Sequence, residues 1–381
     1  MSLNVLGYAG FFKQYLKEIS LFLQELQLQH FRCFEDKKII FNAPITVITG
    51  NNGAGKTSIV EAIYYLSYFK SFRSHVIAEL MQSGWDSFFL KGQFLAEELM
   101  QQHTIQIGYS QKKKSIKFDQ KQITSHKDIL SLFQIVTLTE DDSDLIKGYP
   151  AGRRAFIDQA VLLANPEFLD LYREFKQVLQ HRNALLERYS NNDRIEFEIW
   201  TQKLWQISIK IQQYRQIMMV QIQQSVNQLI DQFFDGVYEI SITYDSKIIA
   251  IDEKFDGFML KIGRVLYQEI AWKRSLFGAH LDDLIFQIRG KKARIFASRG
   301  QQKLISLLCK LALTRIDSGN QAKPLLLIDD FISDFDKIRL KNLIQFFTTC
   351  NNQIIITAPF CDSNLKELLE KADPDVISIS P

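Results

Sequence analysis

A glycine-rich segment at residues 45–58, ITVITGNNGAGKTS, constrains this chain more than any other stretch. Gly50, Gly55, Lys56 and Thr57 satisfy the pattern G-x-x-x-x-G-K-[ST], and the β-branched run before them is typical of a strand. Glycines at these positions let the backbone wrap a polyphosphate and point successive N–H groups at it. The apolar spacing that follows predicts a helix whose positive end also faces the anion. The segment therefore predicts a phosphate-binding loop.

This loop assigns roles to individual side chains. Lys56 is predicted to reach the β- and γ-phosphates of a nucleotide, and the Thr57 hydroxyl to bind Mg²⁺. The alternative is a plain glycine turn, and the strand and helix patterns on either side argue against it. The predicted nucleotide-binding residues are Gly50, Asn51, Asn52, Gly53, Ala54, Gly55, Lys56, Thr57 and Ser58.

Composition sets wider limits. The 381 residues allow two domains, or one large domain with an insert. Lys and Arg number 46 against 43 Asp and Glu, so the net charge of +3 does not argue for nucleic-acid binding, and any DNA surface must be local. The four cysteines form no C-x-x-C pair, which argues against a zinc hook and fits a reducing compartment. No apolar run approaches the about 18 residues of a membrane span, so we expect a cytoplasmic protein.

Periodicity gives a coarse outline of the chain. Residues 22–48 predict two strands around a polar turn, which deliver the chain to the phosphate loop. Residues 87–138 alternate as strands. Residues 165–235 have helical spacing with a polar break at 190–193, which predicts an antiparallel helix pair with arms of about 40 to 60 Å.

Two further constellations lie near the C-terminal end. Ser298 is a good N-cap for a helix of strict apolar period, and Gly300 allows close approach, so this helix start could also take a phosphate. The apolar run at 325–328 predicts a buried strand that presents Asp329 and Asp330 at its carboxyl end. Asp329 is predicted to hold Mg²⁺, and Asp330 to orient or deprotonate an attacking water. The alternative for this pair is an acidic helix N-terminus.

Several cations are candidates for contacts with DNA phosphates. Two follow the loop helix, three lie on a predicted hairpin turn, and two stand at the head of a predicted helix. At each place the alternative is a charge that is merely solvated. The candidates are Lys70, Arg73, Lys112, Lys113, Lys114, Arg153 and Arg154.

The order of these constellations is that of ABC-type ATPase heads, and from about Leu26 the chain resembles the RecF family, in the SMC-like branch of those ATPases. The resemblance rests on the blocks LQHFRCF, GNNGAGKTSIVEAIYYLSYFKSFRSH, GYPAGRRAFID, LQHRNALL, FGAHLDD, ASRGQQK and LLIDDFISDFD. It implies an α/β fold: an ABC-type head with mixed sheets, flanking helices and an inserted helical lobe. The expected domains are an N-terminal extension (1–24), the N-terminal part of the head (25–160), a helical lobe (161–237) and the C-terminal part of the head (238–381).

The resemblance also implies a mechanism. ATP, with Mg²⁺, is expected to be held between two copies of the chain, with Lys56 and Asp330 as the catalytic residues. The second copy would supply a signature loop, Ser298, Arg299, Gly300 and Gln301, and a D-loop, Ser333, Asp334 and Asp336. The ATP-bound homodimer would bind duplex DNA and gapped junctions and, with RecR and RecO, promote RecA loading in gap repair. Its ATPase would be weak and stimulated by DNA.

The sequence departs from the pattern of ABC-type heads at several positions. Ala358 stands where many such heads carry a switch histidine, which predicts slow turnover. Asp330 stands where most have Glu, and Asp334 and Phe335 replace a more usual Glu-Leu. The corresponding Q-loop stretch lies near Glu140 without an evident glutamine. A transporter ATPase subunit and an SMC-like structural clamp are the alternatives. A preference for gapped DNA and stabilisation by RecR would separate the clamp from a repair mediator.

Overall fold

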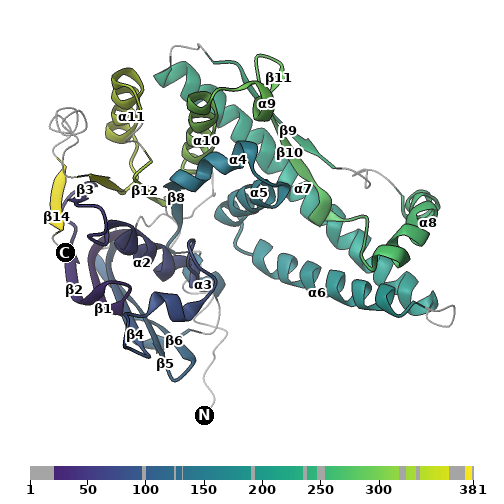
Figure 1. Ribbon diagram of the computed structural model, residues 1–381, viewed down its shortest axis with the longest axis horizontal. Coiled ribbons are helices and arrows are strands. Elements are labelled where there is room, and N and C mark those ends of the chain that lie inside the picture. Colours follow the sequence, from purple (N-terminus) through teal and green to yellow (C-terminus); the bar gives the residue numbers. More distant parts are fainter. Residues whose placement is uncertain are drawn as a thin grey trace. The chain divides into compact units, whose positions relative to one another are not determined.

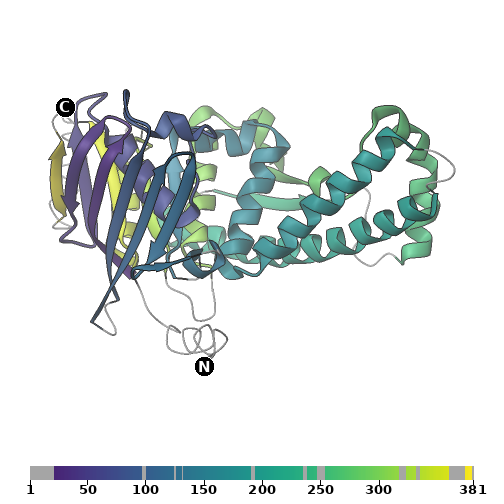
Figure 2. The same ribbon diagram turned by 90° about the horizontal axis from the view of Figure 1, so that it is seen from below.

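The computed structural model describes residues 21–96, 100–123, 126–130, 132–189, 194–234, 238–246, 254–316, 323–331, 335–359 and 374–379. The chain forms two compact units, and its elements are drawn in Figures 1 and 2. Unit 1 comprises residues 1–142, 232–235 and 313–381, and unit 2 comprises residues 143–231 and 236–312.

Unit 1 contains an antiparallel sheet of six strands in the order β2-β1-β4-β5-β6-β7. In β4 buried and half-buried residues alternate strictly, because one face of the sheet covers the core and the other faces solvent. The strands are β1 (Leu21–Phe31), β2 (Phe34–Ile40), β4 (Phe88–Ala96), β5 (Gln101–Ser110), β6 (Lys113–Phe118) and β7 (Lys121–Gln122).

A second sheet of unit 1 has five strands, all parallel, in the order β14-β3-β13-β12-β8. Strand β12 is buried along its whole length, as expected for a parallel strand covered on both faces. One strand, β13, separates β3 from β12, and the carboxyl ends of all three lie at the same edge. The strands are β3 (Ile45–Gly50), β8 (Ile135–Thr139), β12 (Leu325–Asp329), β13 (Ile354–Pro359) and β14 (Asp375–Ile379).

Helix α2 (Lys56–Tyr68) lies between these two sheets and contacts both. It is buried on nearly every side, which explains why its sequence, IVEAIYYL, is apolar around most of its circumference. The other described elements of unit 1 are η1 (Ile77–Leu80), α3 (His126–Leu130) and α11 (Lys337–Thr349), with η3 (Glu140–Ser143) at its border.

Unit 2 is mainly helical and holds a small antiparallel sheet in the order β11-β10-β9. Its strands are β9 (Ile240–Asp245), β10 (Asp283–Ile288) and β11 (Lys291–Lys292). Its helices are α4 (Asp144–Lys147), α5 (Pro150–Ala164), α6 (Phe168–Glu187), α7 (Arg194–Phe233), α8 (Phe255–Trp272), η5 (Ala279–Leu281), α9 (Ala293–Phe296) and α10 (Arg299–Leu313). The last two residues of α7 and the last residue of α10 belong to unit 1.

The structure corrects the expected strand pattern before the phosphate loop. The turn holds only Arg32 and Cys33, and the charged segment behind it forms β2, which pairs with β1. Phe34 and Ile39 of β2 are buried while its charged residues face outward, so the segment can be a strand despite its polarity. The apolar run after the predicted turn was expected to form one strand, but it is split between the two sheets. Its first residues end β2 in the antiparallel sheet, and its last residues form β3 in the parallel sheet.

The helical region also differs in detail. The 20 residues of α6 span about 30 Å and the 40 residues of α7 about 60 Å, so only α7 has the expected length. The polar break at 190–193 lies outside the described residues. Unit 2 is wider than the expected lobe at 161–237, and β1 already begins within the expected extension at 1–24. The division into a head and an inserted lobe stays a prediction.

Candidate nucleotide-binding site

The phosphate loop joins β3 to α2 and needs glycine for two separate reasons. Gly53 and Gly55 have φ values of +84° and +97°, the left-handed region that strains other residues. A Cβ on Gly50 would lie 2.7 Å from the Ile379 carbonyl oxygen, and one on Gly55 would lie 2.5 Å from Cζ of Phe34. At Gly50 and Gly55 the loop backbone lies against its neighbours with no room for a side chain, whereas Gly53 has open space and is needed only for its backbone conformation.

Lys56 begins α2 and is 5% exposed. Its Nζ donates to the carbonyl oxygens of Gly50 (2.9 Å) and Asn51 (3.2 Å). No carboxylate of the described residues forms an ion pair with it. The ammonium is thus held over the loop by two neutral acceptors, which a phosphate could replace with stronger, charge-assisted bonds.

Asp329 ends β12, and its Oδ1 accepts hydrogen bonds from Oγ1 of Thr57 (3.2 Å) and of Thr357 (2.7 Å). Burial raises the pKa of this carboxyl group, although both threonines and the charges of Arg73 and Lys56 act in the opposite direction. The two predicted Mg²⁺ ligands, Thr57 and Asp329, therefore lie together.

The donor set at this position fits Mg²⁺. A hydroxyl and a carboxylate are hard oxygen ligands, and a divalent cation would offset the cost of the buried negative charge. Within the described ranges, no group of three or more His, Cys, Asp and Glu side chains could hold a metal. Mg²⁺ in nucleotide sites is commonly held by one or two protein oxygens together with phosphates, and Thr57 and Asp329 could supply those oxygens.

Asp330 follows with φ +50°, and its N–H donates to Thr357 Oγ1 at 3.0 Å. Burial raises the pKa of its carboxyl group; Lys56 opposes this and Asp329 adds to it. Thr357 thus holds both acidic residues, a role that the sequence analysis missed. The signal in the sequence is a single polar residue, Thr357, within the otherwise apolar run of β13. In the structure this threonine is fully buried.

Glu61 of α2 organises the other side of the loop helix, which the sequence analysis also missed. Its side chain is fully buried, and Arg32 donates to both of its carboxylate oxygens at 2.8 and 2.7 Å. The Ser71 hydroxyl donates to it as well. Arg73 is 45% exposed in its side chain and lies 3.6 Å from the same carboxylate. The β1–β2 turn and the segment after α2 are therefore fixed to the loop helix.

The predicted signature residues open α10 in unit 2. Gln301 N–H donates to Ser298 Oγ at 3.3 Å, and Ser298 N–H donates to Gln301 Oε1 at 2.9 Å, which is a capping box. The N-cap expected at Ser298 is confirmed, and Ser298 and Arg299 are exposed. Contact with a second copy stays a prediction.

The D-loop prediction is only partly within the described residues. Ser333 and Asp334 lie outside them, and Asp336 caps α11 by accepting from the Arg339 N–H at 2.9 Å. Ala358, at the predicted switch position, is a buried methyl group in β13.

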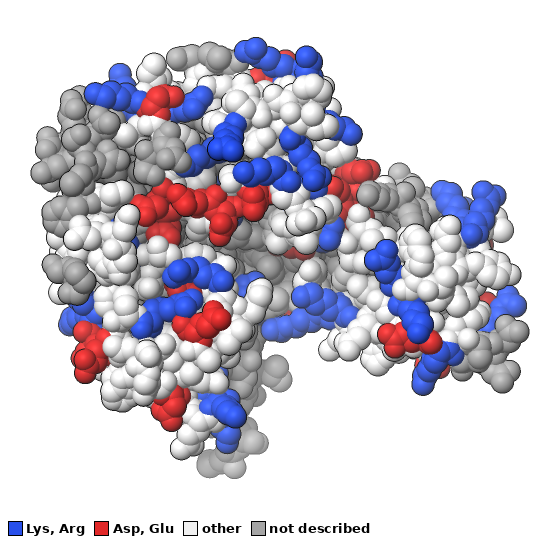
Figure 3. Space-filling view, viewed as in Figure 1, with Lys and Arg blue, Asp and Glu red and all other residues white. Residues whose placement is uncertain are grey.

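The predicted DNA-contacting lysines of unit 1 differ in their surroundings. Figure 3 shows Lys and Arg interspersed with Asp and Glu over one face of the molecule, as a small net charge implies. Lys70, Lys112 and Lys113 are exposed. Lys114 instead donates to the Phe69 carbonyl at 2.7 Å and lies over the Tyr65 ring, and burial lowers its pKa. Its inward position does not fit a contact with DNA.

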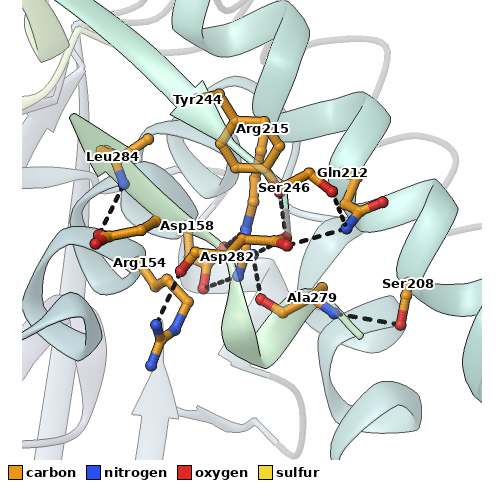
Figure 4. Close-up of polar contacts among 11 residues, drawn as sticks. Arg154, Asp158, Ser208, Gln212, Arg215, Tyr244, Ser246, Ala279, Asp282 and Leu284 are labelled. Carbon is orange, nitrogen blue, oxygen red and sulfur yellow. Dashed lines mark hydrogen bonds and ion pairs between the residues drawn. The ribbon is translucent and has the colours of Figure 1, made fainter. Parts of the chain in front are cut away.

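The two predicted arginines of unit 2 have structural partners. Arg153 is 4% exposed, and its guanidinium binds both carboxylate oxygens of Asp283 at 2.6 and 2.9 Å. Arg154 donates to the Asp282 carbonyl at 2.9 Å, and burial lowers its pKa (Figure 4). The burial of Arg153 argues against the predicted DNA contact there, because its guanidinium cannot reach a phosphate in this conformation.

These arginines border a buried network centred on Arg215 of α7 (Figure 4). Arg215 donates to both oxygens of Asp158 at 2.8 and 3.0 Å and to Asp282 at 3.2 Å. Tyr244 and Gln212 also donate to Asp282. Burial disfavours the charge of Arg215, but Asp158, Tyr244 and Asp282 together outweigh it and raise the pKa of the guanidinium. The network joins the GYPAGRRAFID and FGAHLDD blocks, so their sequence signals reflect a shared structural core.

A phosphate loop at the end of β3, an acidic pair at the end of β12, and a helix covered by a second sheet define a P-loop ATPase head of the ABC and SMC type. The model of the RecF/RecN/SMC N-terminal domain matches residues 22–373. This chain belongs to that family, in its RecF branch of DNA replication and repair proteins. The predicted α/β ATPase-head fold is confirmed.

Two curated relatives illustrate the match. The DNA replication and repair protein RecF of Desulfitobacterium hafniense (strain DSM 10664 / DCB-2) is 30% identical over 339 residues, covering 87% of this chain and 92% of that protein. RecF of Leptospira interrogans (strain Fiocruz L1-130) is 30% identical over 342 residues, covering 88% and 92%.

Solved structures share the fold. The recombination mediator protein RecF, described as RecF-ATPrS in the RecFOR pathway, superposes with a TM-score of 0.83 at 23% identity, covering 96% of this chain and 97% of that one. The Smc head domain of Pyrococcus furiosus, bound to a domain of ScpA, has a TM-score of 0.55 at 14% identity, covering 94% of each chain. Of the helices in the described part of this chain, none has the length and apolar character that a membrane span requires.

Proposed function

We propose that this protein is a cytoplasmic, ATP-dependent recombination mediator that binds DNA as an ATP-induced homodimer. The observation that carries the proposal is the joint position of Lys56 on the phosphate loop and of Asp329 between Thr57 and Thr357, in a chain of the RecF family. The arrangement offers a cation, a hydroxyl and a carboxylate at one edge of a parallel sheet, where ligands of such sheets bind.

Residues 50–58 would surround the triphosphate of ATP, with backbone N–H groups as donors. Thr57 and Asp329 would hold Mg²⁺, which when bound neutralises charge on the β- and γ-phosphates. Lys56 would exchange its two carbonyl partners for phosphate oxygens. Asp330 would orient or deprotonate the attacking water. Its raised pKa favours proton uptake, and its short side chain together with Ala358 predicts slow hydrolysis.

The exposed Ser298 and Arg299, with Gly300 and Gln301, would complete the site of a second copy, joined by the D-loop residues Ser333, Asp334 and Asp336. ATP then holds two chains together, and hydrolysis releases them. A monomer should be a poor ATPase, and DNA should stimulate the weak activity by favouring the dimer.

The proposed partners are duplex DNA and junctions next to single-stranded gaps, with RecR and RecO helping the dimer to promote RecA loading. Membership of the RecF branch supports this role, as does the described RecF of the RecFOR pathway. Exposed Lys70, Arg73, Lys112 and Lys113 remain candidate DNA contacts of unit 1.

The test is sedimentation of wild type, Lys56→Met and a control, Lys210→Met on the exposed side of α7, with ATP, ADP or no nucleotide. Each is run with gapped duplex, intact duplex and no DNA. Of these three proteins, we expect wild type and the control to dimerise with ATP but not with ADP or without nucleotide, and Lys56→Met to stay monomeric. Gapped duplex should stabilise the dimer more than intact duplex does. Asp330→Asn should keep the ATP-bound dimer. A chain that stays monomeric throughout would refute the dimer mechanism, and equal binding of intact duplex would refute the mediator role.

A further inference from the structure

The longest strongly basic stretch of the sequence was not among the candidates for DNA binding. Between Arg289 and Arg315 the chain contains no Asp or Glu, although the protein as a whole is nearly balanced in charge. The first part of this stretch, residues 289–299, covers the β10–β11 turn, β11, α9 and the start of α10. We call it the basic ridge.

The cations of the basic ridge are on the surface. Arg289 and Gly290 have φ values of +49° and +71°, which makes a tight turn between two strands. The exposed cations are Arg289, Lys291, Lys292, Arg294 and Arg299. In the described part of the chain none of these five has an ion-pair partner. Lys and Arg gather at the edge of the molecule where Figure 1 draws β11 and α9 (Figure 3). The acidic residue nearest along the sheet is Glu239, whose backbone carbonyl accepts from the Arg289 N–H at 2.9 Å.

The basic ridge also exposes two large apolar side chains. Ile295 is 68% and Phe296 61% exposed, whereas Ala293 of the same short helix and Ala297, which caps its C-terminus, are buried. Helix α9 packs on β10 and β11 through those small residues. Nζ of Lys291 lies 5.6 Å from the Phe296 ring centroid. An aromatic ring is thus presented to solvent among cations.

We propose that the basic ridge binds the single-stranded part of gapped DNA; this rests on the proposed function and assigns its single-strand surface. Four of its exposed cations, Arg289, Lys291, Lys292 and Arg294, lie outside the proposed signature loop and complement a phosphate backbone. The exposed Phe296 ring among them gives an unpaired base a face to stack on. Duplex DNA offers the same phosphates but keeps its bases stacked within the helix. The Phe296 ring therefore favours binding of single-stranded over duplex DNA, whereas the cations would contact the phosphates of either form.

The experiment uses the full chain with ATP and measures fluorescence anisotropy of gapped and intact duplexes over a range of salt concentrations. Lys291→Gln with Lys292→Gln should reduce the slope of log affinity against log salt by about 1.4 for single-stranded contacts. Phe296→Ala should weaken the binding of gapped DNA by about fivefold or more and leave the affinity for intact duplex within about twofold of wild type. The matched control, Lys210→Gln with Arg264→Gln, removes two exposed cations of unit 2 outside the ridge and should leave the slope unchanged.

The same face could instead join two copies of the chain. Sedimentation with ATP and without DNA distinguishes that role from DNA binding. If the ridge variants dimerise as wild type does and lose gapped DNA, the inference stands. If Phe296→Ala abolishes dimerisation without DNA, the face joins two copies and the inference fails. If wild type binds gapped DNA and the ridge variants bind it equally well, the inference alone fails. If wild type binds no gapped DNA with ATP, the proposed function fails together with it.

Discussion

Two groups of buried charge in this protein are built on opposite principles. In unit 2, Arg215 is enclosed by Asp158 and Asp282, so each charge has an opposite charge within hydrogen-bonding distance. In unit 1, the hydrogen-bond partners of Lys56 among the described residues are carbonyl oxygens, and those of the Asp329 carboxylate are threonine hydroxyls. Both groups are buried, but among the described residues only the first is joined by direct ion pairs.

The difference separates a structural centre from a site that awaits a ligand. A paired buried charge resists rearrangement, because removing either partner leaves the other desolvated. A buried charge held by neutral groups costs folding free energy that a polyphosphate and a divalent cation can recover. The following changes test this contrast.

The largest effect is expected in the group around Arg215. Arg215→Met leaves Asp158 and Asp282 buried without their cation, so we expect a loss of about 3 to 5 kcal/mol in the free energy of unfolding. Urea unfolding measures it. The control, Arg173→Met, breaks an exposed ion pair with Asp170 and should cost less than about 0.5 kcal/mol. Similar losses in the two variants would contradict the contrast.

The phosphate loop should respond next most strongly. Gly55→Ala adds left-handed strain of about 1 to 2 kcal/mol and a clash with Phe34 and Cys33 that costs about 1 to 3 kcal/mol more. Gly53→Ala meets nothing within 4 Å and should show the strain alone. Thermal unfolding and fluorescent nucleotide titration measure the pair. Equal stability of the two variants would show that the loop is not packed against the β1–β2 turn.

His280 of unit 2 should make the stability of the protein sensitive to acid. Burial lowers its pKa from 6.5 to about 4; the Ser275 carbonyl opposes the shift and the charges of Arg154, Arg182 and Arg215 add to it. The unfolded chain therefore takes up a proton first, and stability falls as the pH drops from 6.5 towards 4. From pH 7 to pH 5 this costs about 2 kcal/mol. His280→Gln should lose that part of the pH dependence in urea unfolding, and an unchanged profile would contradict it.

The smallest expected effect has the opposite sign. Burial raises the pKa of Asp329, so its ionised form opposes folding at neutral pH and the penalty disappears as pH falls through the raised pKa. Asp329→Asn keeps an acceptor for Thr57 and Thr357, so its melting temperature without nucleotide should be higher than that of wild type. The further rise with ATP and Mg²⁺ should be lost. A less stable variant would show that the carboxylate is satisfied without a cation.

Local patterns predicted the parts of the site that lie within one segment. The glycine spacing around Lys56 gave the loop, and the apolar run before Asp329 gave the strand and its acidic end. Both depend on residues close in sequence, where spacing alone decides the geometry. Strand β2 was not predicted because its charged sequence is typical of a turn. Its pairing with β1 shows that the charged side chains lie on the solvent face of the sheet.

Long-range partners could not be predicted in this way. Thr357 meets Asp329 because β12 and β13 are in register, and Arg32 meets Glu61 because a turn folds back over α2. Arg153 was predicted to contact DNA because it is a cation at the head of a helix, but it forms an ion pair with Asp283, 130 positions away. A single sequence shows which charges exist, but the fold decides which of them remain available.

The neighbours of β3 have a consequence for how the protein is made. In its sheet, β3 lies between β13 and β14, and the hydroxyls of Thr49 and Ser378 hydrogen bond across 329 positions. At about 5 to 20 residues per second, a ribosome needs roughly 15 to 65 s to make the intervening chain. During that time the phosphate loop has neither flanking strand, and Gly50 lacks the Ile379 backbone against which it packs. We therefore expect the phosphate loop to reach its final packing only when nearly the whole chain has been synthesised.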